Sequence, residues 1–182
     1  MKPINRRRLS VLIGSVFAVS SLLAVGVGSA AAGCGWPNCN PAQLSATYTK
    51  SITPPGGQAG NITVHFQSTE SYPGLETWVV WNGTSYAKWL GHTPFNAAAI
   101  TLTDHLHVDG VIVTVSLPPG FTGGGSDASF TNTIYNNWPI YHQFNNVTFT
   151  CFICYGIQED ATATFQFGTS FYTISAHDQA SV

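Results

Sequence analysis

Three side chains near the middle of the chain have the chemistry of a sugar-binding site. Trp81 and Tyr86 carry flat apolar rings that can stack on the face of a pyranose, and Lys88 can donate hydrogen bonds to hydroxyl groups. Asn82-Gly83 separates two runs of β-forming residues, which predicts a hairpin with a type I′ turn. In that hairpin the three side chains share one partly polar face. The alternative is that both faces are buried, as in the middle of a sandwich.

Two histidines have the spacing of metal ligands. His105 and His107 stand two residues apart, so in a strand their imidazoles point to the same face, an arrangement that suits zinc, copper or iron. A complete site needs a further ligand from a neighbouring strand, such as His65 or His142. The competing interpretation is a pair of surface histidines, and the sequence as a whole predicts no metal or other cofactor.

The four cysteines form two local pairs, Cys34 with Cys39 and Cys151 with Cys154. In an exported chain four cysteines indicate two disulfides, and the short separations favour a bond within each local pair. The alternative connectivity ties the N-terminal pair to Cys151 and Cys154, and it stabilises more because it closes longer loops.

No pattern of residues identifies a catalytic site. The chain lacks the G-x-S-x-G, H-E-x-x-H, phosphate-loop and dinucleotide-binding motifs. A glycosidase needs two carboxylates about 5–10 Å apart across a cleft. The acids available for this role are Glu70, Glu76, Glu159 and Asp160. No spacing singles out a pair among them, so the sequence predicts no catalytic residue, although a hydrolase built from such acids stays open.

Residues 1–32 have the pattern of an export signal. Lys2 and the arginines at 6–8 form a positive start, residues 9–27 are apolar or small, and the alanines at 30–32 suit a signal peptidase. These features predict cleavage at the end of this segment and a secreted, extracellular protein of bacterial type, with no stable membrane insertion afterwards. The alternative is an uncleaved membrane anchor, because the apolar stretch is almost long enough to span a bilayer.

Removal of this segment leaves a mature chain with very few positive charges. Lys50 and Lys88 remain against eight acids, which gives a net charge of −6 when the histidines are neutral. Nothing is left to displace counterions from a phosphate backbone, so nucleic acid is excluded as a partner. The aromatic content of 13%, against 8% charged residues, points instead to a neutral partner.

The rest of the chain predicts an all-β fold. Residues 33–60 contain Cys, Pro and Gly without a clear periodicity, which predicts an extended N-terminal arm. Residues 61–182 show alternating apolar residues and repeated turn signals. This pattern predicts an antiparallel β-sandwich, of jelly-roll or Ig-like type, with roughly eight or nine short strands. An up-and-down β-barrel is the alternative fold.

Two further hairpins are predicted from turn residues. One turns at Asp109-Gly110, which places Val108 and Val111 on the same core face. The other turns at Gly168-Thr169, between two runs in which apolar residues alternate with threonines. Strands are also expected at 130–135 and 141–151.

Together these patterns predict a secreted binding module without chemistry of its own. Its partner is expected to be a carbohydrate surface or another exported protein, recognised through Trp81, Tyr86 and Lys88. Two alternatives come from other functional classes. One is a small secreted hydrolase acting on polysaccharide or cell wall, and the other is a toxin or a subunit of a toxin complex.

Overall fold

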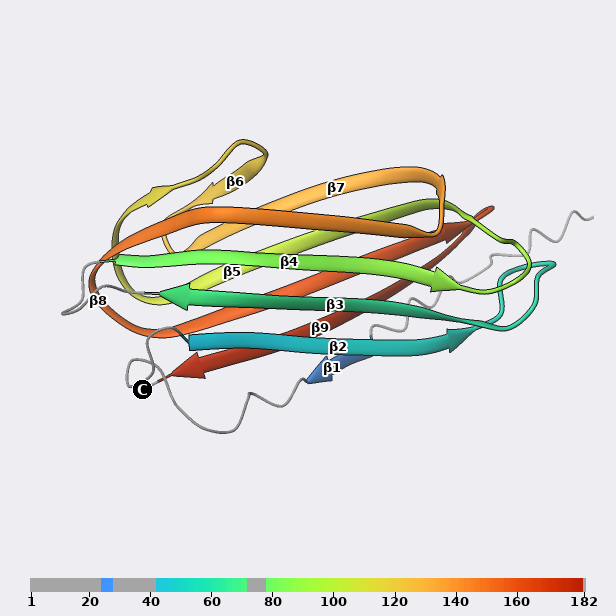
Figure 1. Ribbon diagram of the computed structural model, residues 1–182, viewed down its shortest axis with the longest axis horizontal. Coiled ribbons are helices and arrows are strands. Elements are labelled where there is room, and N and C mark those ends of the chain that lie inside the picture. The colour runs from blue at the N-terminus through green and yellow to red at the C-terminus, as the bar shows by residue number, and fades with distance from the viewer. Residues whose placement is uncertain (1–23, 28–41, 72–77, 182) are drawn as a thin grey trace, which may run out of the picture.

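The computed structural model describes residues 24–27, 42–71 and 78–181, and within these ranges the chain forms strands and no helix (Figure 1). None of the described residues therefore belongs to a helix that could cross a membrane. The strands are β1 (Ala24–Val27), β2 (Ala42–Ile52), β3 (Gly60–Ser71), β4 (Trp78–Leu90), β5 (Ala97–Ser116), β6 (Phe121–Gly124), β7 (Asp127–Asn137), β8 (Pro139–Phe167) and β9 (Ser170–Ser181). Paired strands are antiparallel except β1 and β9, which are parallel.

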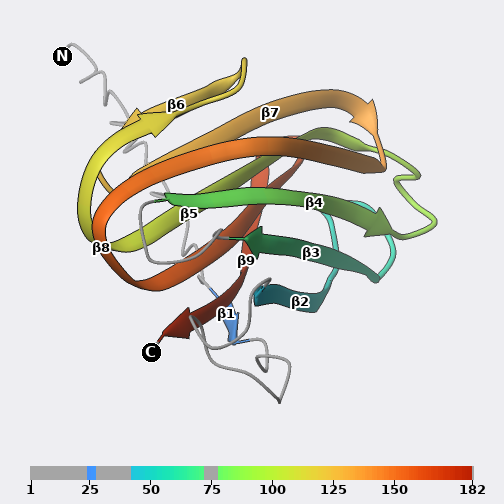
Figure 2. The same cartoon turned by 60° about the vertical axis from the view of Figure 1, so that its left-hand side comes forward.

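The strands lie in two layers because β8 is long enough to pass from one layer to the other. Its first half pairs with β4, its second half pairs with β9, and β5 follows it along most of its length. One layer contains β2, β3, β4 and the start of β8, and the other contains β7, β5, the end of β8 and β9 (Figures 1 and 2). The sheet does not close into a barrel. The predicted β-sandwich is thus confirmed, and the alternative barrel is not observed.

The core lies between the two layers and is filled by alternate residues of the strands. In β3 the buried apolar residues are Ile62, Val64 and Phe66, and in β8 they include Phe165 and Phe167. Each large apolar side chain buried in this way stabilises the fold by about 1.5–3 kcal/mol. The intervening residues point away from the core and form the two outer faces of the sandwich.

The hairpin predicted at Asn82-Gly83 is not formed, because β4 continues through this pair. The pair marks a β-bulge instead. The register against β8 shifts between Trp81 and Gly83, and Asn82 Oδ1 accepts a 2.9 Å hydrogen bond from the backbone N–H of Asn146. A Cβ on Gly83 would lie 2.7 Å from Cζ of Phe144, so close packing favours glycine here. Because the strand continues, Trp81 lies on the core face.

The hairpin predicted at Asp109-Gly110 is also absent, since β5 continues to Ser116 alongside β8. The register is irregular at this point, and the backbone of Ile153 comes so close to Gly110 that a side chain would collide with it. Because of this irregularity, the alternation of core-facing and outward-facing residues before Gly110 does not continue in the same phase to the end of β5. Val108 is fully buried as predicted, but Val111 is 59% exposed, so its predicted core position is wrong.

The third predicted hairpin is confirmed. Phe167 of β8 pairs with Ser170 of β9, and the pairing continues away from the turn as far as Gly156 and Ser181. Gly168 at the turn has a φ of 60°, a conformation that favours glycine. The strand predicted at 130–135 lies within β7. The strand predicted at 141–151 is the first part of β8, which continues past residue 151 instead of ending there.

Part of the predicted N-terminal arm belongs to the sandwich. Residues 42–52 form β2, which pairs with β3 along its whole length and buries Leu44 completely. These residues are therefore a strand of the folded domain and not an arm. The four residues of β1 fall within the predicted export signal, so cleavage after Ala32 would remove β1 and leave β9 without this parallel partner.

Candidate functional site

Tyr86 lies on the outer face of the first layer, with an aromatic neighbour on each side. The register places His65 of β3, Tyr86 of β4 and Tyr141 of β8 directly beside one another. The ring centroids of His65 and Tyr86 are 4.9 Å apart, and those of Tyr86 and Tyr141 are 5.9 Å apart. These three residues, called the aromatic row below, form a strip of rings across the strands. Tyr141 is 65% exposed, so the strip is open to a ligand.

The charge on this face is small and sits beside the aromatic row. Lys88 follows Tyr86 on the same face of β4, and its Nζ lies 4.8 Å from the centroid of the Tyr86 ring, a cation–π contact. Partial burial, together with the charge of Lys88, lowers the pKa of His65, so this imidazole is neutral at pH 7. His65 Nδ1 and Thr47 Oγ1 are 2.7 Å apart and hydrogen-bonded, which holds the imidazole in place.

Hydrogen-bonding side chains flank the aromatic row on both sides. Thr49 and Thr63 lie next to Lys88 in the register, and their hydroxyl oxygens are 2.9 Å apart. On the other side Thr84 faces Gln143 across β4 and β8. The outer face therefore combines apolar rings with hydroxyl and amide groups, which is the combination that a sugar ring requires.

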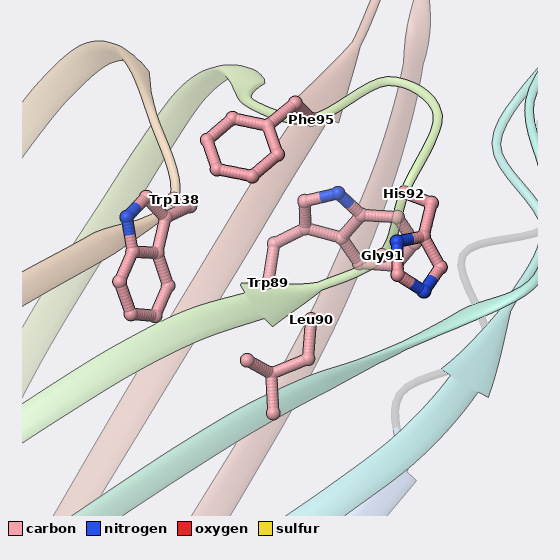
Figure 3. A pocket seen from close by; sticks show the side chains of 6 residues that line it. All are labelled: Trp89, Leu90, Gly91, His92, Phe95 and Trp138. Carbon is pink, nitrogen blue, oxygen red and sulfur yellow. The ribbon is translucent and has the colours of Figure 1, made fainter.

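A pocket of about 330 Å³ lies where β4 ends, beyond Lys88 on the same side of the molecule. Figure 3 shows Leu90, Phe95 and Trp138 grouped around the indole of Trp89. Phe95 is 68% exposed, whereas Trp89 is buried and fixed by hydrogen bonds from its Nε1 to Pro94 O and from its backbone N–H to Trp138 O, both 2.8 Å. Along β4, Lys88 lies between this pocket and Tyr86 of the aromatic row.

Trp81 is not part of this face, contrary to the sequence-based prediction. It is fully buried, and its Nε1 donates hydrogen bonds of 3.1 Å to Ser68 Oγ and to Glu159 Oε2. Of the three predicted binding residues, the structure brings Tyr86 and Lys88 together and places Trp81 in the core. The neighbours that complete the row, His65 and Tyr141, come from other strands and were missed.

The interior holds a pair of carboxyl groups that the sequence did not single out. Glu70 and Glu159 are fully buried, and both are hydrogen-bonded to the hydroxyl of Ser68 between them. Burial raises the pKa of Glu70 to about 8. Burial, together with the charges of Asp104 and Glu70, holds the pKa of Glu159 well above its ordinary value. A polysaccharide cannot reach this pair, so it is not a glycosidase site.

A second buried group joins a serine, an aspartate and a histidine. Asp104 Oδ2 accepts a hydrogen bond of 2.8 Å from Ser85 Oγ and lies 2.6 Å from His142 Nδ1. In a nucleophilic triad the histidine stands between the serine and the acid, whereas here the acid stands between the other two. All three are buried, and His142 Nε2 finds no hydrogen-bond partner among the described residues. This arrangement is a structural network, not a nucleophile with its base.

His105 and His107 lie on the outer face of the opposite layer, far from the aromatic row. Both contact Asp127 Oδ1, at 3.1 Å from His105 Nε2 and 2.8 Å from His107 Nδ1. Partial burial lowers the pKa of His107, but hydrogen bonds and charges from Asp127 and Asp109 outweigh it, so this pKa is raised overall. Within the described ranges, no group of three or more His, Cys, Asp or Glu side chains is arranged to hold a metal ion.

Cys151 and Cys154 form a disulfide, with their Cα atoms 5.7 Å apart, as the local pairing predicted. The bond spans the bend by which β8 passes from one layer to the other. Cys34 and Cys39 lie outside the described residues, so their predicted bond stays a prediction.

No known protein family, curated protein or solved structure matches this chain. The function is therefore inferred from the geometry of the site alone.

Proposed function

We propose that the protein is an exported, non-catalytic binding module that holds a neutral carbohydrate surface on the aromatic row and the adjoining pocket. The observation that carries this proposal is the exposed strip of His65, Tyr86 and Tyr141, with ring centroids 4.9 and 5.9 Å apart. The neighbouring rings, tilted against one another by 35° and 50°, can present apolar area to the C–H faces of sugars, and the flanking threonines supply hydrogen bonds.

Charge supports a neutral ligand. The face carries the positive charge of Lys88, while the chain after residue 32 has two lysines against eight acids. A net negative protein repels anionic polymers over distances up to a Debye length, about 8 Å at physiological salt. Neutral glycans meet no such repulsion, and Lys88 can still donate hydrogen bonds to their hydroxyl groups.

The placement of the acids supports binding without hydrolysis. Glu70 and Glu159 face the core, and the residues that line the pocket beside the aromatic row include no carboxylate. The disulfide between Cys151 and Cys154 is of the kind that persists in oxidising compartments, which supports export.

The test measures retention of the purified protein on insoluble neutral glycans such as cellulose, chitin and xylan. We expect Tyr86→Ala and Tyr141→Ala each to weaken binding about two- to tenfold, since one aromatic contact contributes about 0.5–1.5 kcal/mol. Neither substitution should lower the melting temperature by more than a few degrees. The matched control is Tyr135→Ala, which removes a 75% exposed tyrosine of β7 in the other layer.

Two results would contradict the proposal. In the first, the unmodified protein is retained by none of the glycans. In the second, Tyr135→Ala weakens retention as much as Tyr141→Ala does, which would show that the effect does not depend on the aromatic row.

A further inference from the structure

The hydroxyl of Ser68 is hydrogen-bonded to two carboxyl groups at once, those of Glu70 and Glu159. A hydroxyl has one proton and can donate to one of them only. The other carboxyl must be protonated and donate its own proton to Ser68 Oγ. The raised pKa of both acids agrees with this, because it keeps at least one of them neutral at pH 7. The site thus holds an alcohol, a neutral carboxylic acid and a second carboxyl group in contact.

We infer that Ser68 and Glu159 condense to an ester that links the two layers of the sandwich. Ser68 Oγ attacks Cδ of the neutral Glu159 carboxyl, while the Glu70 carboxylate accepts the hydroxyl proton. Glu70 then returns this proton to the departing oxygen of Glu159, which leaves as water. One C–O bond forms and one breaks, so the step needs no oxidant, reductant or cofactor.

The indole of Trp81 is placed to assist this reaction. Its Nε1 donates a 3.1 Å hydrogen bond to Glu159 Oε2, the oxygen that carries the proton of the neutral carboxyl and, with the proton returned by Glu70, leaves as water. Glu159 Oε1 finds no hydrogen-bond partner among the described residues and stays on Cδ as the carbonyl oxygen of the ester.

Burial favours the ester over the separate groups. Groups held in contact within a fold reach effective concentrations of about 10⁵–10⁸ M, which opposes the mass action of water. Ser68 is 1% exposed, and both glutamates are fully buried, so bulk water has no access to hydrolyse the product.

The bond would connect distant parts of the chain. Ser68 lies in β3 and Glu159 in the second half of β8, at a sequence separation of 91 residues. The disulfide between Cys151 and Cys154 has a separation of 3. A cross-link that closes a longer loop restricts the unfolded chain more strongly, so the ester would contribute more to stability than this disulfide.

The test uses the positions of the lysines. Lys50 and Lys88 are the basic residues that remain after residue 32, so trypsin produces one peptide from 51 to 88, with Ser68, and another from 89 onwards, with Glu159. After reduction of disulfides, mass spectrometry of the digested wild type should show the two peptides joined. Their joint mass should be lower than their sum by one water, and alkaline hydroxylamine should separate them.

Variants complete the design. Ser68→Ala should give two separate peptides. Ser85→Ala, the matched control, removes another buried serine that donates to a carboxylate, and it should leave the joined species intact. Separate, unmodified peptides from the wild type would overturn the inference, even if Ser68→Ala fails to fold. Loss of water confined to the 51–88 peptide would also overturn it, because the ester would then be with Glu70.

Discussion

Nε1 of Trp81 donates a 3.1 Å hydrogen bond to Oε2 of Glu159 across the interior of the sandwich. Trp81 comes from β4 in one layer, and Glu159 comes from the second half of β8 in the other. The same Nε1 also contacts Ser68 Oγ, so the indole joins the layers and satisfies a buried acid at the same time. This placement explains why Trp81 is in the core and not on the outer face that carries the aromatic row.

We expect Trp81→Ala to lower the free energy of unfolding by about 3–5 kcal/mol, because it removes a large buried ring. Trp81→Phe keeps most of the volume but loses the N–H donor, and about 1–3 kcal/mol should be lost. Urea unfolding measures both. The control Trp78→Ala removes a 43% exposed indole from the same strand and should cost much less. Equal losses of unfolding free energy in Trp81→Ala and Trp78→Ala would contradict the placement of Trp81 in the core.

The stability of the domain should fall as the pH rises from about 5 to 8. Glu70 has a pKa of about 8 in the folded protein, against an ordinary value of 4.5, which applies to the unfolded chain. Between these values the unfolded chain releases a proton that the folded protein retains, so rising pH favours unfolding. At about 1.4 kcal/mol per pKa unit, the contribution of Glu70 to this loss is at most about 5 kcal/mol by pH 8.

Urea midpoints measured between pH 5 and pH 8 test this pH dependence. Glu70→Gln, which cannot ionise, should make the curve less steep, and the part that comes from the raised pKa of Glu159 should remain. Phe171→Ala removes a half-exposed side chain that does not ionise and should leave the pH dependence unchanged. Stability that increases steadily from pH 5 to pH 8 in the wild type would show that Glu70 is not held in its neutral form.

Gly83→Ala should destabilise the protein by about 1–3 kcal/mol through overpacking. The added Cβ would lie 2.7 Å from Cζ of Phe144 and 2.9 Å from Cβ of Ser68, in the middle of the bulge. Gly124→Ala is the control, because a Cβ at that position meets nothing within 4 Å. Thermal unfolding distinguishes the two variants. Equal melting temperatures for the two variants would contradict the prediction, because they would show that the side chains around Gly83 shift to accommodate the added Cβ at little cost.

The sequence predicts the core well wherever burial alternates along a strand. Ile62, Val64 and Phe66 are inward because every second residue of β3 is apolar, and the β8–β9 hairpin follows from a glycine between two such runs. The continuity of β4 could not be predicted. An Asn-Gly pair suits a turn and a bulge equally, and the choice depends on β8, which is distant in the sequence.

The candidate site was only partly predictable for the same reason. Tyr86 and Lys88 lie on one strand two residues apart, so they share a face whichever strands lie beside them. His65 and Tyr141 join them only through the pairing of β3, β4 and β8, which no local pattern reveals. The interior acids are equally hidden, since Ser68, Glu70 and Glu159 read as polar positions until the register places them inside.

The bulge at Asn82-Gly83 has a consequence for how the sequence of this protein can evolve. Because β4 is unbroken, Ser85 points to the interior acids and its neighbour Tyr86 points to the outer face that carries the aromatic row. The same division holds in β8 for His142 and Tyr141. Adjacent codons thus specify separate properties, stability on one side and, under the proposed function, recognition on the other. New specificities can arise by exchange of the outward residues alone, while the interior network is inherited unchanged.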